Sequence, residues 1–226
     1  MTVILGAMDG EVAAITNNMA VHDRDAWNGF PIVTGAISGK PVVVSRTGVG
    51  KTLSAMLCQH LIDVFSPERI IFTGVAGSLR RELDVGDTVV ARDTLQHDMD
   101  VTPLGFEIGR IPYSPHRIYT CDEELVRRAM AIDPPHGQAH LGRILTGDQF
   151  IANAERRETL ARELDGDAVE MEGASVGLVA TVNGVPFLLI RTISDHSDGS
   201  AVEFEKVVSY AADNSWHYLS RILQEC

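Results

Sequence analysis

The chain has 226 residues, 45% of them hydrophobic, and a formal net charge of −12. This size suits one α/β domain with a substantial core, and the charge argues against a surface for nucleic acid or anionic membrane. No apolar run is long enough to span a bilayer, the first residues resemble a strand rather than a signal peptide, and three widely spaced cysteines predict no disulfide framework. We therefore expect a cytoplasmic protein with reduced thiols.

Apolar stretches with strand character alternate with helical patterns along the chain. In chain order we expect strands at residues 2–5, 30–38, 41–47, 69–72, 88–91, 143–146, 169–172 and 185–193. Helices are expected at residues 11–15, 48–65, 121–132, 155–164, 173–183 and 202–224. Residues 96–115 form a long irregular segment, which at this length indicates a functional or interface role. The alternation predicts one α/β domain over residues 1–226 with a mostly parallel sheet.

Two carboxylates stand at the end of the predicted strand 169–172, and α/β proteins place their chemistry at such strand ends. Glu170 and Glu172 flank Met171 among apolar neighbours. Burying an ionised carboxylate is costly without a partner, so the pair indicates a cavity whose ligand supplies hydroxyl donors. The alternative is a surface turn with two solvated acids, and this stretch alone does not decide between them.

Two further strand ends are candidates for chemistry. Asp195 follows the most continuous apolar strand, where desolvation favours a protonated carboxyl that serves as a general acid. The alternative is a turn or helix-cap aspartate, for which the neighbouring Ser197 and Asp198 are more natural candidates. The glycines of residues 73–77 either open backbone N–H groups to a ligand or make a plain tight turn.

Two other motifs suggest sites that the sequence does not support. Residues 45–52, SRTGVGKT, end like a phosphate-binding P-loop, but that motif needs glycine where Ser45 stands, so a plain turn is preferred. Residues 97–100, HDMD, combine imidazole and carboxylates that suit a divalent ion. Only one side of such a site is visible, so a hydrogen-bonded strand end or a subunit contact is favoured. The sequence predicts no metal site.

Five motifs occur in one order along the chain: GAMDGEV at residues 6–12, TGVAG at 73–77, GDQFI at 147–151, VEME at 169–172 and RTISD at 191–195. Together they resemble the motif set of the 5′-methylthioadenosine/S-adenosylhomocysteine nucleosidases, in the purine nucleoside phosphorylase superfamily. The resemblance extends from about Val3 to Leu223. It implies a three-layer α/β/α fold with a central mixed sheet. It also implies hydrolysis of the N-glycosidic bond of these adenine nucleosides, with no metal or organic cofactor.

The resemblance also implies a role for each site residue. Asp195 protonates N7 of adenine, Glu11 activates the attacking water, and Glu172 accepts hydrogen bonds from the ribose hydroxyls. The base is bound by Phe150 and Ile151, the sugar by Met171, and the apolar 5′ end by Val49 and Phe204. Further substrate-binding positions are Met8, Val75, Ala76, Gly77 and Ser194. In a homodimer, the partner's pocket is completed by Leu104, Phe106 and Pro112.

Three alternatives to this function are weighed against the residues. A phosphate-dependent phosphorylase needs cationic and hydroxyl groups where this chain has Phe72 and Val75, although Arg46 could serve phosphate. Val75 also replaces a serine that many family members carry. A nucleoside-binding sensor has no need of both Glu11 and Asp195. The segments 95–98 and 147–150 resemble members that also accept aminodeoxyfutalosine, so that substrate stays open.

Overall fold

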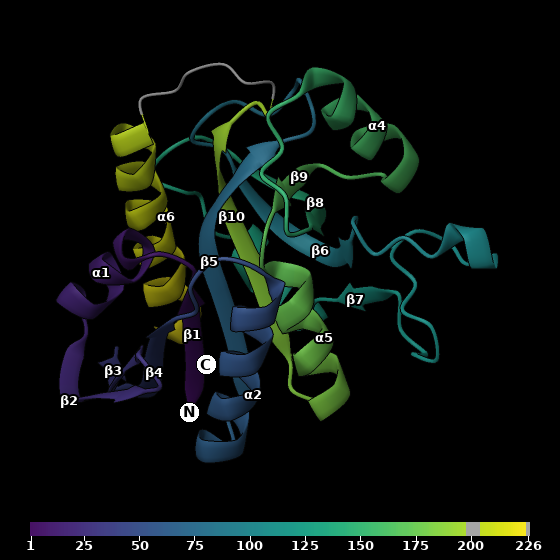
Figure 1. The fold of residues 1–226 in the computed structure, drawn as a ribbon. Coiled ribbons are helices and arrows are strands. Elements are labelled where there is room, and N and C mark those ends of the chain that lie inside the picture. Colours follow the sequence, from purple (N-terminus) through teal and green to yellow (C-terminus); the bar gives the residue numbers. More distant parts are fainter. Residues whose placement is uncertain (198–203, 225–226) are drawn as a thin grey trace.

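The computed structural model describes residues 1–197 and 204–224, and its ten strands form one mixed sheet (Figure 1). The strands are β1 Thr2–Gly6, β2 Ala20–Trp27, β3 Phe30–Ile37, β4 Lys40–Arg46, β5 Arg69–Ser78, β6 Thr88–Gln96, β7 Ile118–Thr120, β8 Ala139–Thr146, β9 Ala168–Glu170 and β10 Phe187–Asp195. The helices are α1 Asp9–Asn18, α2 Lys51–Phe65, α3 Glu123–Met130, α4 Ala154–Leu164, α5 Gly173–Asn183 and α6 Phe204–Gln224, with a 3₁₀ turn η1 at Thr102–Leu104. The strand order is β10-β6-β8-β9-β5-β1-β4-β3-β2, and β10 also pairs with β5, which closes five strands into a ring.

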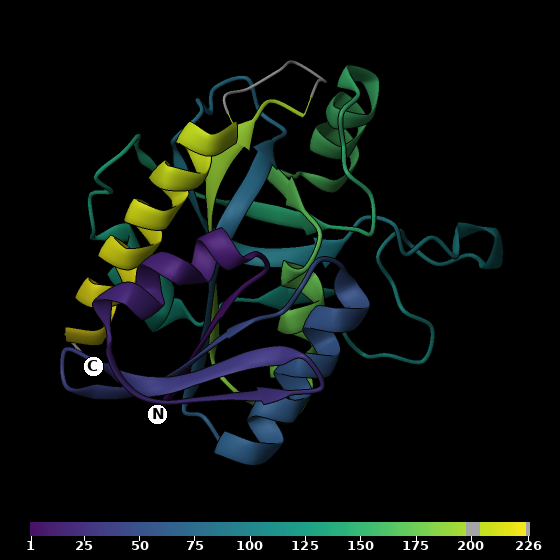
Figure 2. The same ribbon diagram turned by 60° about the vertical axis from the view of Figure 1, so that its left-hand side comes forward.

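Helices cover both faces of the sheet, which confirms the predicted three-layer α/β/α class. Figures 1 and 2 show α1 and α6 on one face and α2 and α5 on the other. Alternate residues of a strand point to opposite faces. Accordingly, Ile4 and Ile71 pack with α1 and α6, whereas Leu5 and Phe72 pack with α2 and α5. Both faces of the central strands are thus buried, as expected for parallel strands in this architecture.

Three strands are clearly longer than the sequence predicts, and one of them is β8, which begins at Ala139 rather than residue 143. β5 continues through residues 73–77, which were expected to form a turn, because this glycine-containing stretch pairs with β10 as far as Gly77. β6 continues to Gln96, because residues 93–95 pair with β7 and residues 93–96 pair with β8. The irregular segment therefore begins at His97, and it extends away from the body of the molecule in Figures 1 and 2.

Other elements differ at their ends or were not predicted. The expected helix at 121–132 is only Glu123–Met130, because the Asp122 side chain caps it by accepting the Leu125 N–H at 3.0 Å. The strand predicted at 169–172 ends at Glu170. Strand β2 was not predicted, because its sequence AVHDRDAW forms an exposed sheet edge with no apolar face.

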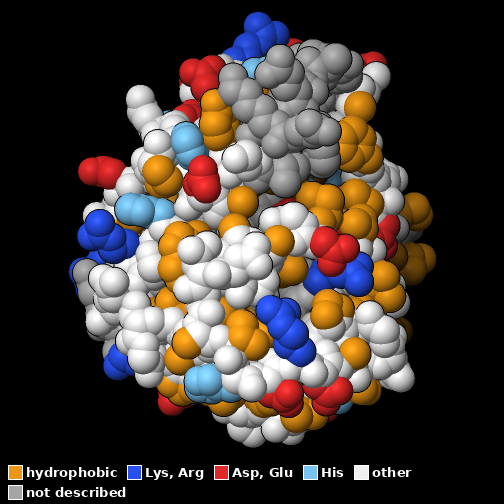
Figure 3. Space-filling view, turned by 90° about the vertical axis from the view of Figure 1, so that its left-hand side faces the viewer, with side chains coloured by type: hydrophobic (Ala, Val, Ile, Leu, Met, Phe, Trp, Pro, Cys, Tyr) orange, Lys and Arg blue, Asp and Glu red, His pale blue; other side chains and the backbone are white. Residues whose placement is uncertain are grey.

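The surface agrees with the scattered charge of the sequence. In Figure 3, which shows the side at the left of Figure 1, basic, acidic, hydrophobic and neutral side chains are interspersed. No helix among the described residues is long and apolar enough to cross a membrane.

A fully buried ion pair joins β10 to the end of β9. The Arg191 side chain is 1% exposed, and its Nη2 donates to Glu170 Oε2 at 2.8 Å. The same guanidinium lies 4.1 Å from the centre of the Phe72 ring and donates to the Phe72 carbonyl oxygen at 3.3 Å. Glu170 therefore has a structural partner, and the pair fixes the end of β9.

We expect Arg191→Met to lower the free energy of unfolding by about 3–5 kcal/mol, because it leaves the Glu170 carboxylate buried without its counter-ion. Urea unfolding measures the change. The matched control is Arg81→Met, which removes an ion pair to Glu158 from a side chain that is 79% exposed and costs less than about 1 kcal/mol. Equal losses in the two variants would contradict this account of the buried pair.

Candidate active site

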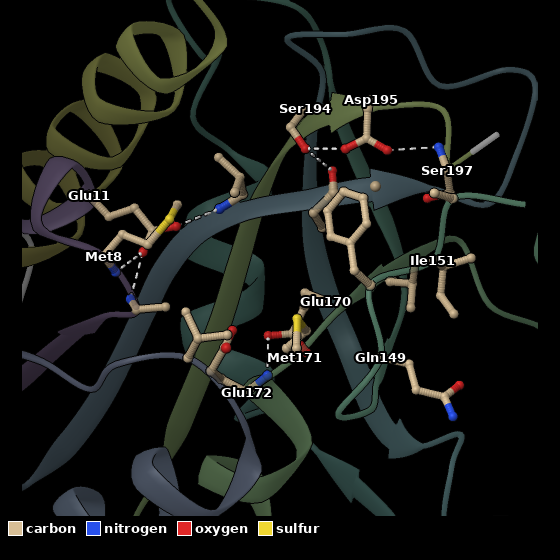
Figure 4. A pocket seen from close by; sticks show the side chains of 18 residues that line it. Met8, Glu11, Gln149, Ile151, Glu170, Met171, Glu172, Ser194, Asp195 and Ser197 are labelled. Atoms are coloured by element: carbon tan, nitrogen blue, oxygen red, sulfur yellow. Dashed lines mark hydrogen bonds between the residues drawn. The ribbon is translucent and has the colours of Figure 1, made fainter. Parts of the chain in front are cut away.

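A cavity of about 460 Å³ opens at the C-terminal ends of β1, β5, β9 and β10 (Figure 4). Twelve predicted site residues line it: Met8, Glu11, Val49, Val75, Ala76, Gly77, Phe150, Ile151, Met171, Glu172, Ser194 and Asp195. Leu104, Phe106 and Pro112 do not line the cavity of their own chain, and the Phe204 side chain lies outside the described part of the structure. The structure thus brings together segments that are up to 187 positions apart, from Met8 to Asp195.

Glu11 is held rigidly at one side of this cavity. It lies in the first turn of α1, and its Oε2 accepts the N–H groups of Ala7 and Met8, the latter at 2.8 Å. Its Oε1 accepts the Val75 N–H at 3.1 Å. Burial raises the pKa of Glu11, although the Arg191 charge and these three amides act against the rise. The result is a fixed carboxyl group with a raised proton affinity, which is suited to a general base.

The replacement of serine by valine at position 75 leaves this arrangement intact, because the Glu11 contact uses the backbone amide of Val75. Gly74 is required beside it, since a Cβ there would lie 2.6 Å from Glu11 Oε1. The backbone donor at position 75 thus does not require a serine hydroxyl.

A sharp bend separates the two carboxylates that flank Met171. β9 ends at Glu170, whose Oε2 accepts the N–H groups of Glu172 and Gly173 at 3.1 and 2.7 Å. This bend directs Glu170 toward Arg191, while Glu172 lies at the cavity as the residue before α5. Met171 lines the cavity beside Glu172, which the alternation of a straight strand would have prevented.

The Glu172 carboxylate is almost fully buried and has one neutral partner. Its Oε1 accepts the Gly50 N–H at 2.8 Å. Burial and the nearby Glu170 charge raise the pKa of Glu172 to about 8. This acceptor needs further hydrogen-bond donors, as expected for a group that binds ligand hydroxyls.

We expect Glu172→Gln to stabilise the protein increasingly as pH rises. The pKa of Glu172 is higher in the folded state than in the unfolded state. The stability that protonated Glu172 contributes to wild type is therefore present near pH 5 and is lost as pH rises through about 8. The variant should therefore gain stability relative to wild type between pH 5 and pH 9, by up to about 4 kcal/mol, since the pKa is raised from 4.5 to about 8 and one pKa unit is worth about 1.4 kcal/mol. Urea unfolding at both pH values, with the exposed Glu82→Gln as control, measures this gain, and a gain no larger than the control's would refute it.

Asp195 is the last residue of β10, and both of its carboxyl oxygens accept hydrogen bonds. Its Oδ2 accepts the Ser194 hydroxyl at 2.6 Å, and its Oδ1 accepts the Ser197 N–H at 2.8 Å. Asp195 itself thus forms the turn interaction that the sequence assigned more naturally to Ser197 or Asp198, and Asp198 lies outside the described residues. The half-buried carboxyl also lines the cavity, so the turn fixes its orientation toward a ligand.

Figure 4 shows the three acids on separate sides of one space. Glu11 lies on one side, Asp195 and Ser194 on another, and Glu172 with Met171 on a third, while the loop bearing Gln149 and Ile151 forms a further wall. Phe150 and Val49 are 77% and 51% exposed. The lining also includes Glu170 and five residues that were not predicted to bind substrate: Ala7, Gln149, Ala152, Val169 and Ser197. Ala7, Gln149 and Val169 belong to three of the five motifs, whereas Ala152 and Ser197 lie outside them.

The two motifs that suggested other sites contact each other through Lys51 and Asp98. Lys51 Nζ donates to Asp98 Oδ1 at 2.6 Å and to Gln96 Oε1 at 3.3 Å, so its charge is paired rather than free for phosphate. Within the part of the chain that the structure describes, no three His, Cys, Asp or Glu side chains are arranged to hold a metal ion. Asp98 is hydrogen-bonded, as predicted, but both ring nitrogens of His97 are buried without a partner.

Residues 2–224 match the phosphorylase superfamily, which spans nearly the whole chain. The chain therefore belongs to that superfamily.

Individual relatives narrow the class. The chain is 36% identical over 216 residues to the 5′-methylthioadenosine/S-adenosylhomocysteine nucleosidase of Shewanella halifaxensis, with 94% of each chain covered. The Neisseria meningitidis nucleosidase bound to methylthio-immucillin-A superposes with a TM-score of 0.92 at 29% identity, covering 100% of this chain and 99% of that one. Helicobacter pylori futalosine hydrolase gives the same TM-score at 32% identity, covering 100% and 97%. Within the superfamily, the chain is a member of the methylthioadenosine/adenosylhomocysteine nucleosidases, which are N-glycosidases.

Proposed function

We propose that this chain hydrolyses the N-glycosidic bond of 5′-methylthioadenosine and S-adenosylhomocysteine through Asp195, Glu11 and Glu172. One observation carries the proposal: three carboxyl groups, each fixed by its own hydrogen bonds, face one cavity from different sides. A nucleoside has three matching parts, namely a base, a ribose with hydroxyl donors, and the C1′ atom that water attacks.

The reaction follows from these positions. Asp195 donates its proton to N7 of adenine, so that the C1′–N9 bond breaks with its electron pair leaving on a neutral base. Positive charge develops on the ribose as in an oxocarbenium ion. Glu11 accepts a proton from the water whose oxygen bonds to C1′. Glu172 accepts hydrogen bonds from the ribose hydroxyls, and Met171 packs against the sugar.

Two solved structures of similar proteins support the substrate class. The Neisseria meningitidis nucleosidase binds methylthio-immucillin-A, and a Helicobacter pylori nucleosidase with an Asp→Asn substitution holds 5′-methylthioadenosine in its active site. Both are about 30% identical to this chain over almost its full length. The similarity to futalosine hydrolase favours aminodeoxyfutalosine as a further substrate.

The phosphorylase alternative has little support from the cavity. Phe72 is buried under Arg191, and Val75 contributes only a backbone amide that Glu11 already uses. Arg46 Nε lies 2.8 Å from Asp9 Oδ1, and Arg46 does not line the cavity. An anionic nucleophile would also be repelled by ionised Glu11, so water is the expected nucleophile.

We also propose a homodimer in which Leu104, Phe106 and Pro112 complete the partner's pocket. Leu104 is 74% exposed and Phe106 39% exposed, on the segment that extends from the body in Figures 1 and 2. Val49 and Phe150 leave an apolar rim at the cavity mouth. Sedimentation should give twice the chain mass, and a monomer at micromolar concentration would refute the dimer.

The direct experiment compares kcat/KM for methylthioadenosine, adenosylhomocysteine and aminodeoxyfutalosine, with adenine release as the readout. We expect multiple turnovers on the first two nucleosides. Tight binding of these nucleosides with no adenine release would favour the sensor alternative and contradict the proposed activity.

A further inference from the structure

Two segments that have no role in the proposed chemistry contact each other beside the cavity. They are the P-loop-like turn of residues 45–52 and the HDMD motif of residues 97–100. Lys51 Nζ and Asp98 Oδ1 are 2.6 Å apart, and their side chains are only 17% and 13% exposed. Burial alone would raise the pKa of Asp98, but hydrogen bonds from Lys51 and from the Asp148 amide lower it. The ion pair is therefore a well-formed contact rather than a solvated surface pair.

This ion pair is tied to the loop that lines the base side of the cavity. Asp98 Oδ2 accepts the Asp148 N–H at 2.8 Å, and Asp148 Oδ1 accepts the Lys51 N–H at 2.8 Å. These three contacts form a closed circuit between Lys51 at the start of α2, Asp98 two residues after β6, and Asp148. Phe150 and Ile151 follow directly on the same loop and line the cavity.

The same turn also fixes the ribose side. The N–H of Gly50, next to Lys51, donates to Glu172 Oε1 at 2.8 Å. Gly50 has φ +99°, a conformation that favours glycine, and a Cβ there would lie 3.1 Å from Asp148 Oδ1. The turn therefore contacts Glu172 through the Gly50 amide, and it contacts Asp148, in the loop that leads to Phe150, through the Lys51 amide.

Close packing holds the start of the loop against the His-Asp motif. A Cβ on Gly147 would collide with the His97 ring and lie 3.0 Å from Asp98 Cγ. His97 is 2% exposed, and its ring nitrogens have no hydrogen-bond partner. The imidazole therefore acts as a packing surface for Gly147, and the ion pair supplies the polar contacts.

We propose that Lys51 is a positioning residue that couples base binding to ribose binding. Its pairing with Asp98 holds the loop of residues 147–151 and the Gly50 amide in one arrangement. Phe150 can then bind the base while Glu172 binds the ribose of the same nucleoside. This inference rests on the proposed roles of those two residues. Glu11 and Asp195 are held by other segments, so loss of the pair weakens nucleoside binding more than it slows the chemical step.

The test uses Lys51→Met in the full chain, because methionine keeps the side-chain length and the backbone N–H while it removes the ammonium group. We expect KM for methylthioadenosine to rise about 10-fold and kcat to fall less than about 3-fold. Asp98→Asn should show the same split, and the double variant should be no worse than either single one, because both remove one interaction. Lys51→Arg should restore part of the affinity, and Lys40→Met, at an exposed hairpin position, should change neither constant.

A merely structural role gives a different pattern. It lowers the amount of folded enzyme, so kcat falls while KM stays within 2-fold of wild type, and that result would overturn the inference. Calorimetric titration with adenine keeps the test independent of turnover. If wild type releases no adenine from methylthioadenosine, the proposed function fails, yet weaker adenine binding by Lys51→Met would still support the coupling, and equal binding would refute it.

Discussion

Asp195→Asn is expected to lower kcat for methylthioadenosine by about 10²–10⁴-fold, the range typical for loss of a general acid, while nucleoside affinity stays within about 3-fold of wild type. Asparagine has the same shape, and its amide oxygen can still accept the Ser197 N–H that holds the turn. It has no proton to donate to N7 at neutral pH. The cavity therefore persists, but adenine has to leave without a proton on N7 and so departs as an anion.

Single-turnover adenine release measures the chemical step for this variant, and calorimetry with methylthioadenosine measures its affinity. Asp25→Asn, on the exposed strand β2, is the matched control and should equal wild type in both. Turnover within tenfold of wild type in the Asp195 variant would remove the carboxyl from its assigned role.

Glu11→Gln is expected to reduce kcat/KM by about 10²–10⁴-fold, because the amide cannot take a proton from water. Both oxygens of the Glu11 carboxylate accept backbone N–H groups, so the NH2 group of glutamine would face one of these donors without being able to accept from it. This mismatch would disturb the geometry that binds the water. Glu11 must be ionised to act as a base, and its pKa is raised by burial. Wild-type kcat/KM should therefore fall, as pH is lowered, at a pH above the ordinary glutamate value.

The pH profile separates this role from a structural one. Residual activity of the Glu11→Gln variant should lack the acidic limb that wild type shows. Glu123→Gln, at an exposed position in the first turn of α3, should keep it. An acidic limb that persists unchanged in the Glu11 variant would assign the base to another group.

Much of this fold follows from local patterns. The hairpin β3–β4 and helices α2 and α5 have clear periodicity and strong turn residues, and they were predicted within about three residues. β2 and β7 were not, because an exposed edge strand and a three-residue strand have no apolar period of their own. Their pairing is decided by distant strands, and a sequence pattern does not record it.

The site shows the same division. Strand-end acids and the five motifs predicted the cavity lining, since chemistry in this sheet collects at the strand ends. The bend after Glu170 and the contact between Lys51 and Asp98 were not predicted. Both involve partners far along the chain: Arg191 pairs with Glu170, and Asp98 pairs with Lys51.

The sugar product formed from methylthioadenosine, with and without inorganic phosphate, tests the hydrolytic mechanism most directly. If water attacks C1′ with the help of Glu11, the product is free methylthioribose under both conditions, and the rate of adenine release does not depend on phosphate. Mass spectrometry of the products distinguishes this from transfer to phosphate. Phosphate-dependent formation of methylthioribose 1-phosphate would contradict the mechanism.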